Sequence, residues 1–298
     1  MSKEQQTLAI PDISMNFKKL EVEAVDEQRL ALRERGNKYR IMIFVLKELS
    51  PHFPGLELGY YGGRDVDDVV DGDKPLPKGF ETVDSWIDDL AGHIDTMGTS
   101  KQKIITEPNT AFVFQQAINY LQPLENEGKG DSVKRECIGF LEAMRLEYHR
   151  RIGQTVLTGE EILQGYWQGF GHAQNITLIA LKSKIRIPPD CPPVDKLLQM
   201  PVNELPLVLP IILGKTYAIK DLEADLERGI CNIPKSVLEE SGLTLSMLMR
   251  NPSKALNNQT IKNWAEGELN VSRQLARKLR LKKLDMPAKL MVGFLTAR

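Results

Sequence analysis

The sequence predicts an all-α protein, and three observations carry this prediction. Apolar residues recur at helical spacing along most of the chain. No segment alternates apolar and polar residues as a half-buried strand does, and no internal repeat occurs. Stretches rich in glycine and proline, such as 72–79, separate the helical segments. Because 298 residues are enough for a sizeable core, we expect one helical domain at 28–298 after a polar, partly disordered lead-in at 1–27.

The first half of this domain is expected to begin with a helix that starts near residue 28. This helix contains the apolar run 41–46, and Pro51 and Pro54 mark its end. The next helix stops where the glycine- and proline-rich loop begins, and each of the three that follow carries one apolar stripe. The ranges expected for these four helices are 56–70, 83–97, 110–123 and 132–150.

In the second half, Thr158 is expected to open a helix that runs to about residue 181. Glu161, three residues later, completes a capping box with it. The proline-rich stretch 187–193 is interpreted as a loop between helices, and Gly229 ends the helix that follows. The remaining expected helices are 206–228, 236–249, 258–284 and 288–296.

The composition excludes several classes of function. A net charge of −1 gives no reason to expect nucleic acid as a partner. The three cysteines are widely spaced, which indicates neither a zinc site nor a disulfide framework. The N-terminus lacks the apolar core of a signal peptide, and no uncharged apolar run reaches the ~18 residues of a membrane span. We therefore expect a cytoplasmic protein, with its oligomeric state left open.

A basic segment near the C-terminus suits peripheral contact with a membrane. Cationic side chains on a helix bind anionic lipid, and the alternative is a solvated face. The residues concerned are Arg273, Arg277, Lys278, Arg280, Lys282 and Lys283.

The segment 64–71 carries the first candidate site. Asp67 and Asp71 stand four residues apart, so on a helix they share one face with Cβ atoms about 6 Å apart. Carboxylates at this spacing repel each other unless a cation binds between them. Asp68 is either a supporting ligand or a solvated neighbour, and Arg64 either pairs with it or contacts a phosphate.

A second acidic pair, Asp221 and Asp225, repeats this spacing far downstream. Two such pairs facing each other across a cleft would form an oxygen-rich site for Mg²⁺. That ion takes one or two carboxylates and completes its shell with water and substrate phosphate, and Mn²⁺ would serve as a substitute. The alternative for either pair is an acidic helix face exposed to solvent. The two pairs together favour a metal-dependent enzyme that acts on a diphosphate.

Three stretches resemble the squalene/phytoene synthase family of isoprenoid synthases. Residues 60–71 resemble the family's first motif, aromatic-x-x-x-Arg-x-x-Asp-Asp-x-x-Asp. Residues 220–234 are similar to its second, Arg-Asp-x-x-x-Asp-x-x-x-Gly-Arg-x-Tyr-x-Pro. Between them, 160–169 resembles the helix whose tyrosine, here Tyr166, lines the family's prenyl cavity. The likeness runs from residue 37 to about 245 in the family's order.

The resemblance implies a bundle of helices around a central apolar cavity. In the family, metal ions and cationic side chains at the cavity mouth bind a prenyl diphosphate and draw off pyrophosphate, which leaves an allylic cation. Aromatic walls then stabilise the cation by about 1–2 kcal/mol per contact. Tyr60, Tyr166 and Phe170 are the candidates here, with ordinary core residues as the alternative. The implied metal ligands are Asp67, Asp68, Asp71, Asp221 and Asp225.

Departures from the family pattern concern the diphosphate contacts and the cavity. Lys220 replaces an arginine, which keeps the charge and loses the bidentate fork. Lys38 and Arg40 stand in place of a serine-rich phosphate-binding turn and are candidate phosphate contacts, with a solvated turn as the alternative. His172 in the cavity helix would accept a proton from a carbocation or orient pyrophosphate, and a hydrogen-bonded structural histidine is its alternative. Arg228 is expected to pair with its helix neighbours Glu223 and Glu227.

The leading functional hypothesis is a Mg²⁺-dependent prenyltransferase that couples two prenyl diphosphates head to head. The second is a class I terpene cyclase acting on one prenyl diphosphate. Its carbocation chemistry would suit polar cavity residues, although the chain lacks the Asn-x-x-x-Ser-x-x-x-Glu motif of many cyclases. The third is a non-catalytic lipid-binding or assembly factor. The chain keeps both acidic pairs, and this is the observation against that third hypothesis. The polar residues concerned are Gln168, His172, Gln174 and Asn175.

Overall fold

The computed structural model describes residues 55–99, 108–124, 132–180, 183, 185–200 and 207–278. Within these ranges the protein is helical and has no strand, which confirms the predicted all-α class. A short 3₁₀ helix, η1, spans Gln122–Leu124. The α-helices are α3 (Leu56–Val70), α4 (Val83–Thr96), α5 (Pro108–Leu121), α6 (Ser132–Ile152), α7 (Gly159–Ala180), α8 (Val194–Gln199), α9 (Leu209–Lys220), α10 (Leu222–Glu227), α11 (Lys235–Ser241), α12 (Leu245–Arg250), α13 (Ser253–Asn257) and α14 (Gln259–Lys278).

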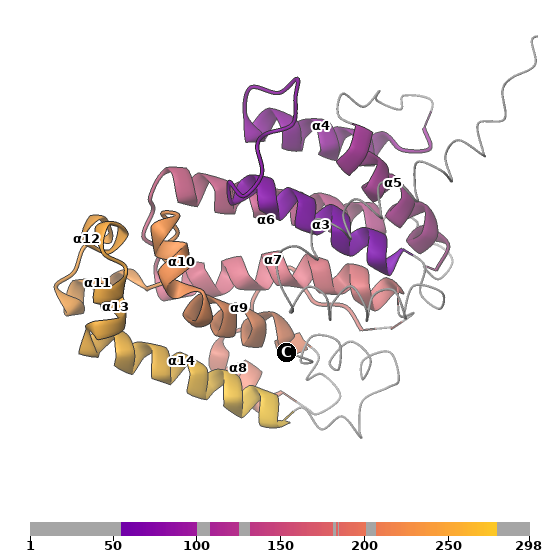
Figure 1. The fold of residues 1–298 in the computed structure, drawn as a ribbon. Coiled ribbons are helices and arrows are strands. Elements are labelled where there is room, and N and C mark those ends of the chain that lie inside the picture. The colour runs from indigo at the N-terminus through magenta and orange to yellow at the C-terminus, as the bar shows by residue number, and fades with distance from the viewer. Residues whose placement is uncertain are drawn as a thin grey trace, which may run out of the picture.

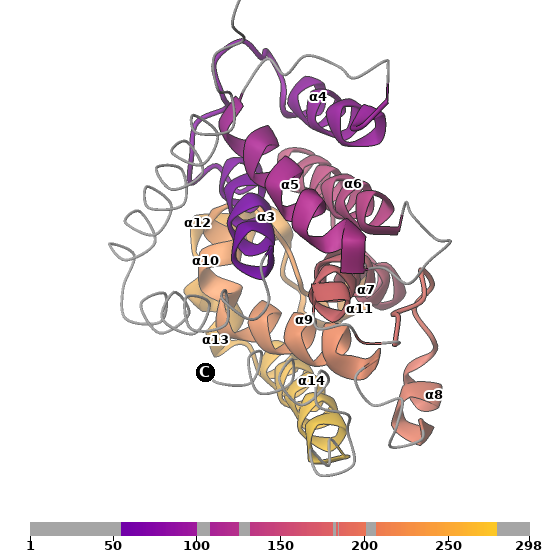
Figure 2. The same cartoon turned by 90° about the vertical axis from the view of Figure 1, so that its right-hand side faces the viewer.

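The long helices pack in a continuous stack (Figures 1 and 2). α4 packs on α6, α6 on α7, α7 on α9, and α9 on α14 at the other extreme. α3 packs against α5 and α6 beside this stack, and the short helices α10 to α13 gather at one end of it. None of the described helices is both long and apolar enough to cross a membrane. α7 therefore lies between the two outer halves of the stack, with α6 on one side and α9 on the other.

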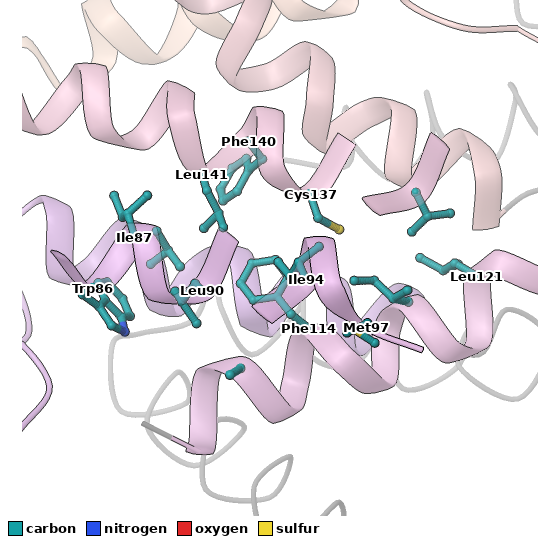
Figure 3. Close-up of a cluster of buried hydrophobic side chains, with 14 of the residues drawn as sticks. Trp86, Ile87, Leu90, Ile94, Met97, Phe114, Leu121, Cys137, Phe140 and Leu141 are labelled. Carbon is teal, nitrogen blue, oxygen red and sulfur yellow. The ribbon is translucent and has the colours of Figure 1, made fainter. Parts of the chain in front are cut away.

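The largest apolar cluster joins α3, α4, α5 and α6 (Figure 3). Trp86, Ile87 and Ile94 of α4 are fully buried in one cluster with Phe140 and Leu141 of α6. Full burial of a large apolar side chain stabilises a fold by about 1.5–3 kcal/mol. The same cluster takes in the last apolar residues of α3, which fixes the rotation of that helix. Those residues are Val66, Val69 and Val70.

A second apolar cluster joins α7 to α9 and α14. Trp167 of α7 packs there with Leu209 and Ile211 of α9, and its indole N–H donates to the carbonyl of Pro188 at 2.6 Å. The proline-rich stretch after α7 is therefore tied to that helix, as expected for a loop between helices. This cluster holds α7 and α9 in a fixed relation, and the two helices form adjoining parts of the pocket described below.

Some helix boundaries follow the sequence pattern and others do not. The expected helix 56–70 is α3 without change, and the capping box forms at Thr158, whose backbone N–H donates to Glu161 at 2.8 Å. The expected helix 206–228 is two helices, because Asp221 leaves helical geometry with φ −100° and ψ 11°. Likewise 236–249 is divided, because Gly242 adopts a left-handed φ of 69°. The expected helices before residue 55 and at 288–296, the lead-in at 1–27 and the end of the basic segment lie outside the described residues.

Candidate active site

A pocket of about 1280 Å³ lies between α3, α6, α7, α9 and α10. All four aspartates of the two acidic pairs line it. Asp67 lies in α3 and Asp71 just after it, while Asp221 and Asp225 come from the junction of α9 and α10 and from α10 itself. The fold thus brings two motifs that are far apart in the sequence to one pocket.

Cationic side chains hold the first motif in place. Arg64 lines the pocket, forms an ion pair with Asp67 and lies 2.7 Å from the carboxylate of Asp68 one turn later. Asp68 is buried, lies 3.7 Å from Lys74 as well, and is not among the described residues that line the pocket. Asp68 therefore acts as a buried ion-pair partner of Arg64 and Lys74, and we do not retain it as a metal ligand.

Arg228 connects the two motifs across the pocket. Its guanidinium lies 3.6 Å from the carboxylate of Asp71 and 3.1 Å from that of Asp73. These contacts replace the expected pairing with Glu223 and Glu227. The reason is that Arg228 follows the last turn of α10, which directs its side chain toward the end of α3 rather than along its own helix.

An asparagine and an arginine orient the second motif. Asn232 donates to Oδ2 of Asp225 at 2.9 Å, and Arg150 of α6 donates to Oδ1 of Asn232 at 2.9 Å. Arg150 also donates to the backbone carbonyl of Cys231. Sequence reasoning had singled out neither residue. The only signal was that Asn232 stands where the family's second motif has a tyrosine, two residues before Pro234.

Glu147 adds a further carboxylate that the sequence did not indicate. It lines the pocket from α6, and its carboxylate lies 3.3 Å from the guanidinium of Arg150. Its charge raises the pKa of Asp71 and of Asp225, which places it close to both motifs. This end of the pocket, defined by Asp67, Asp71, Glu147, Asp221 and Asp225, is called the acidic end below.

Burial and repulsion by neighbouring carboxylates raise the pKa of three residues at the acidic end, Asp67, Asp71 and Asp225. Burial, and next the charge of Asp67, raise the pKa of Asp71 from 3.8 to about 8 against the opposing effect of Arg228. Burial and the charge of Asp221 raise the pKa of Asp225 to about 7, although the hydrogen bond from Asn232 lowers it. Burial also raises the pKa of Asp67, which Arg64 opposes. A bound cation would remove this repulsion.

The donor set at the acidic end fits Mg²⁺. Its ligands are carboxylate oxygens, which that hard ion prefers. Within the described residues, no three His, Cys, Asp or Glu side chains lie close enough together to hold a metal ion by themselves. Mg²⁺ needs only one or two carboxylates, because water and phosphate oxygens complete its shell. Each aspartate pair thus supplies the number of carboxylates that one such ion takes.

Aromatic side chains line the pocket beside the acidic end. Tyr60, Tyr166 and Phe170 all contribute to the wall. The ring of Tyr166 packs so closely on α9 that a Cβ atom at Gly214 would collide with it. Phe170 stacks on Tyr217, with ring centroids 6.1 Å apart and planes inclined by 17°. Burial raises the pKa of Tyr166, so its phenol stays neutral at physiological pH.

His172 is not among the described residues that line the pocket. α7 turns it toward α6, where its Nδ1 lies 2.8 Å from Oε2 of Glu136 and its ring packs against Gly139. A position six residues after Tyr166 lies about two-thirds of a turn away around the helix, which is the geometric reason. This placement matches the structural alternative, and we assign His172 no part in catalysis.

The remaining predicted substrate contacts are the cationic ones. Lys220 is half exposed, lies 3.8 Å from Asp221, and extends over the ring of Tyr217 with its Nζ 5.5 Å from the ring centroid. It therefore stands at the rim of the pocket rather than in its wall. Lys38 and Arg40 lie outside the described residues.

Comparisons of the chain with models of protein families, with curated proteins and with solved structures give no match. Functional inference accordingly rests on the residues of the pocket.

Proposed function

We propose that this protein is a Mg²⁺-dependent isoprenoid synthase that ionises a prenyl diphosphate and couples two prenyl chains head to head, as squalene and phytoene synthases do. One observation carries the proposal: both acidic pairs line a single pocket whose neighbouring wall is aromatic and apolar. A prenyl diphosphate would match both parts of the pocket. A divalent cation would bridge its diphosphate to the carboxylates, and its hydrocarbon tail would lie against the aromatic and apolar wall. We further propose that the helices form one domain with this pocket as its central cavity.

The side chains at the acidic end have separate roles in this proposal. Asp67, Asp71, Asp221 and Asp225 would hold Mg²⁺, which when bound supplies Lewis-acid stabilisation of the departing pyrophosphate. Arg64 and Arg228 already contact carboxylates at this end, through ion pairs that a diphosphate can replace. Guanidinium groups bind phosphate oxygens through two parallel hydrogen bonds. The arginines are therefore suited to orient the leaving group.

The aromatic wall is suited to the allylic cation that remains after pyrophosphate departs. Tyr166 and the stacked pair Phe170 and Tyr217 lie in the pocket wall beside the acidic end. Ring faces attract a cation by electrostatics, by about 1–2 kcal/mol where water is excluded. The neutral phenol of Tyr166 adds no charge that would trap the cation.

The volume of the pocket is large enough for two prenyl chains. Pockets that bury one drug-sized ligand measure about 300–1,000 Å³, and this pocket measures about 1280 Å³. The excess suits two prenyl chains.

Product analysis tests the proposal. The purified protein is incubated with geranyl, farnesyl and geranylgeranyl diphosphate, with and without Mg²⁺, and the organic product is identified by mass spectrometry. We expect Mg²⁺-dependent release of pyrophosphate and a product with twice the carbon count of its substrate. An unchanged carbon count would identify a cyclase instead. Binding without release from any substrate would point to a lipid-binding or assembly role.

A further inference from the structure

The side chain of Gln174 is buried in the pocket wall without a hydrogen-bond partner. Its exposed fraction is 3%, and neither its amide nitrogen nor its amide oxygen is hydrogen-bonded within the described part of the chain. Polar neighbours on α7 are satisfied. Asn175 bonds Glu136 and both backbone groups of Ile187, and Thr177 donates to a backbone carbonyl of its own helix. The unpaired amide is therefore specific to Gln174.

A buried amide without partners destabilises a fold, and such groups are rare in native proteins. Leucine or methionine would fill the same space without this cost. The presence of glutamine here is explained if a bound molecule supplies the missing hydrogen bonds.

Gln174 lies in the part of the pocket away from the acidic end. Tyr166, Phe170 and Gln174 follow one another at four-residue intervals on one stripe of α7, and all three line the pocket. Tyr166 is next to the acidic end, since the charges of Glu147 and Asp225 act on it. Gln174 lies eight residues further along, about 12 Å by the rise of an α-helix. Its neighbours on α7 that also line the pocket include the apolar residues Ala173 and Ile176.

We propose that Gln174 forms a subsite for a hydroxyl group on the hydrocarbon chain of the bound isoprenoid. An amide offers both a donor and an acceptor, and a hydroxyl group can accept from the one and donate to the other. A plain hydrocarbon chain leaves both unpaired. The inference rests on the proposed function in one respect, because it places the diphosphate at the acidic end and the hydroxyl-bearing part of the chain toward Gln174.

The subsite makes the protein selective for oxygenated prenyl chains. A site that hydrogen-bonds a hydroxyl group binds the analogue that lacks it more weakly, because the buried polar groups of the protein then stay unpaired. The selectivity therefore depends on the burial of Gln174. A glutamine in contact with water would not produce it.

Binding measurements with matched ligands test this inference. The ligands are the thiolodiphosphates of geraniol and farnesol, which resist ionisation, and the same compounds with a hydroxyl group on the terminal carbon of the chain. Calorimetry in the presence of Mg²⁺ gives the dissociation constant of each. For at least one of the two chain lengths, we expect the hydroxylated ligand to bind about fivefold or more tightly than its parent, the effect of one well-formed hydrogen bond.

Two variants locate the effect. Gln174→Met keeps the length of the side chain and removes both polar atoms, so the preference for the hydroxylated ligand should disappear while the parent binds at least as well as before. Its melting temperature should equal or exceed that of the wild type, because no unpaired amide remains. Gln168→Met makes the same change on the same helix, at a partly exposed position of the same pocket, and should retain the preference.

Three results would overturn the inference: equal binding of hydroxylated and parent ligands by the wild type, a preference that survives Gln174→Met, or a clear loss of stability in that variant. The first would mean that water satisfies the amide. Repeating the comparison with farnesol and its terminally hydroxylated form, which carry no diphosphate, separates this inference from the proposed function. If no diphosphate binds but the hydroxylated alcohol is still preferred through Gln174, only the proposed function fails.

Discussion

At the scale of single residues, the orientation of Asp225 depends on side chains from two other segments. Asn232 donates a hydrogen bond to its carboxylate, and Arg150 of α6 holds Asn232 in turn. Groups that orient metal ligands in this way typically change metal affinity or activity by about 10–100-fold when they are removed. The proposed metal site therefore extends beyond the four aspartates.

The variant Asn232→Ala tests this dependence. It removes the hydrogen bond to Asp225 and leaves the carboxylate free to turn toward solvent. We expect the Mg²⁺ concentration that gives half-maximal pyrophosphate release to rise about tenfold or more. The melting temperature should fall as well, because Asn232 is buried and Arg150 loses one of its acceptors. A Mg²⁺ requirement equal to that of the wild type would show that Asn232 does not position the ligand.

The raised pKa of Asp71 predicts how stability changes with pH. Between its unfolded value of 3.8 and its folded value of about 8, the metal-free folded protein keeps a proton that the unfolded chain has released. The unfolded state is therefore increasingly favoured as pH rises, and folding stability should fall from about pH 4 to pH 8. Urea unfolding in EDTA at several pH values measures this slope.

Two controls accompany the pH series. Mg²⁺ binds the deprotonated carboxylates of the folded protein, so its addition should make the decline in stability smaller. Asp71→Asn should also reduce the slope, because the asparagine does not titrate. Stability of the metal-free protein that increases over this range would contradict the assignment.

Which site residues the sequence could predict depends on how local their signal is. The four aspartates were found because each pair stands at helical spacing within one segment, and Tyr166 because it stands in a motif. Glu147 and Arg150 pair with each other three residues apart on α6, a spacing that an ordinary charged helix face also shows. Their place in the site depends on segments far along the chain, since the further partner of Arg150 is Asn232. His172 was misplaced because its direction depends on the close approach of α6 at Gly139.

At the scale of helices, the pocket depends on close contact between α7 and α9. Gly214 leaves space on α9 for the ring of Tyr166, and the ion pair between buried Lys215 and Glu268 ties α9 to α14 on its other side. α9 is thus fixed from both sides. The contacts themselves could not be predicted, because helical periodicity does not specify which helices meet.

Paired glycine variants test the contact at Gly214. Gly214→Ala places a methyl group against the ring of Tyr166, and we expect a loss of stability of about 1–3 kcal/mol with reduced activity. Gly267→Ala in α14, where no atom lies within 4 Å of the added Cβ, should instead raise stability by about 1 kcal/mol through helix propensity. Urea unfolding measures both. If the two variants have equal stability, Tyr166 does not require the space at Gly214.

The ion pair between α9 and α14 predicts an asymmetric effect of mutation. Lys215 is 4% exposed and Glu268 26% exposed, so a charge left alone is costlier at Lys215. Glu268→Gln should therefore destabilise the fold by about 3 kcal/mol or more, and Lys215→Met by less. The double variant should recover stability relative to Glu268→Gln. Additive losses would show that the pair is not coupled.

Helix boundaries illustrate the same limit of local information. The range of α3 follows from its apolar spacing and the loop after it. The break at Asp221 has no proline or glycine to announce it, and the short helix α13 is only five residues long. Gly242 could have been recognised as a helix end, because glycine is common in the left-handed position it adopts.

At the scale of the whole molecule, the proposed function requires that two distant segments form one metal-dependent diphosphate site. α3 is held by the cluster it shares with α4, α5 and α6, whereas α9 belongs to the cluster with α7 and α14. The pocket lies between these two packing units. The activity should therefore need an intact carboxylate pair from each.

The most direct test measures Mg²⁺-dependent pyrophosphate release by two variants, Asp71→Asn and Asp225→Asn, one from each motif. The control is Glu223→Gln, which changes an exposed carboxylate outside the pocket wall. Farnesyl and geranylgeranyl diphosphate serve as substrates, and circular dichroism confirms that each variant is folded. We predict that both aspartate variants lose at least about 100-fold in rate, roughly 2.7 kcal/mol, while Glu223→Gln keeps the rate of the wild type. If the wild type releases pyrophosphate and either aspartate variant releases it at the same rate, a single site built from both motifs is contradicted.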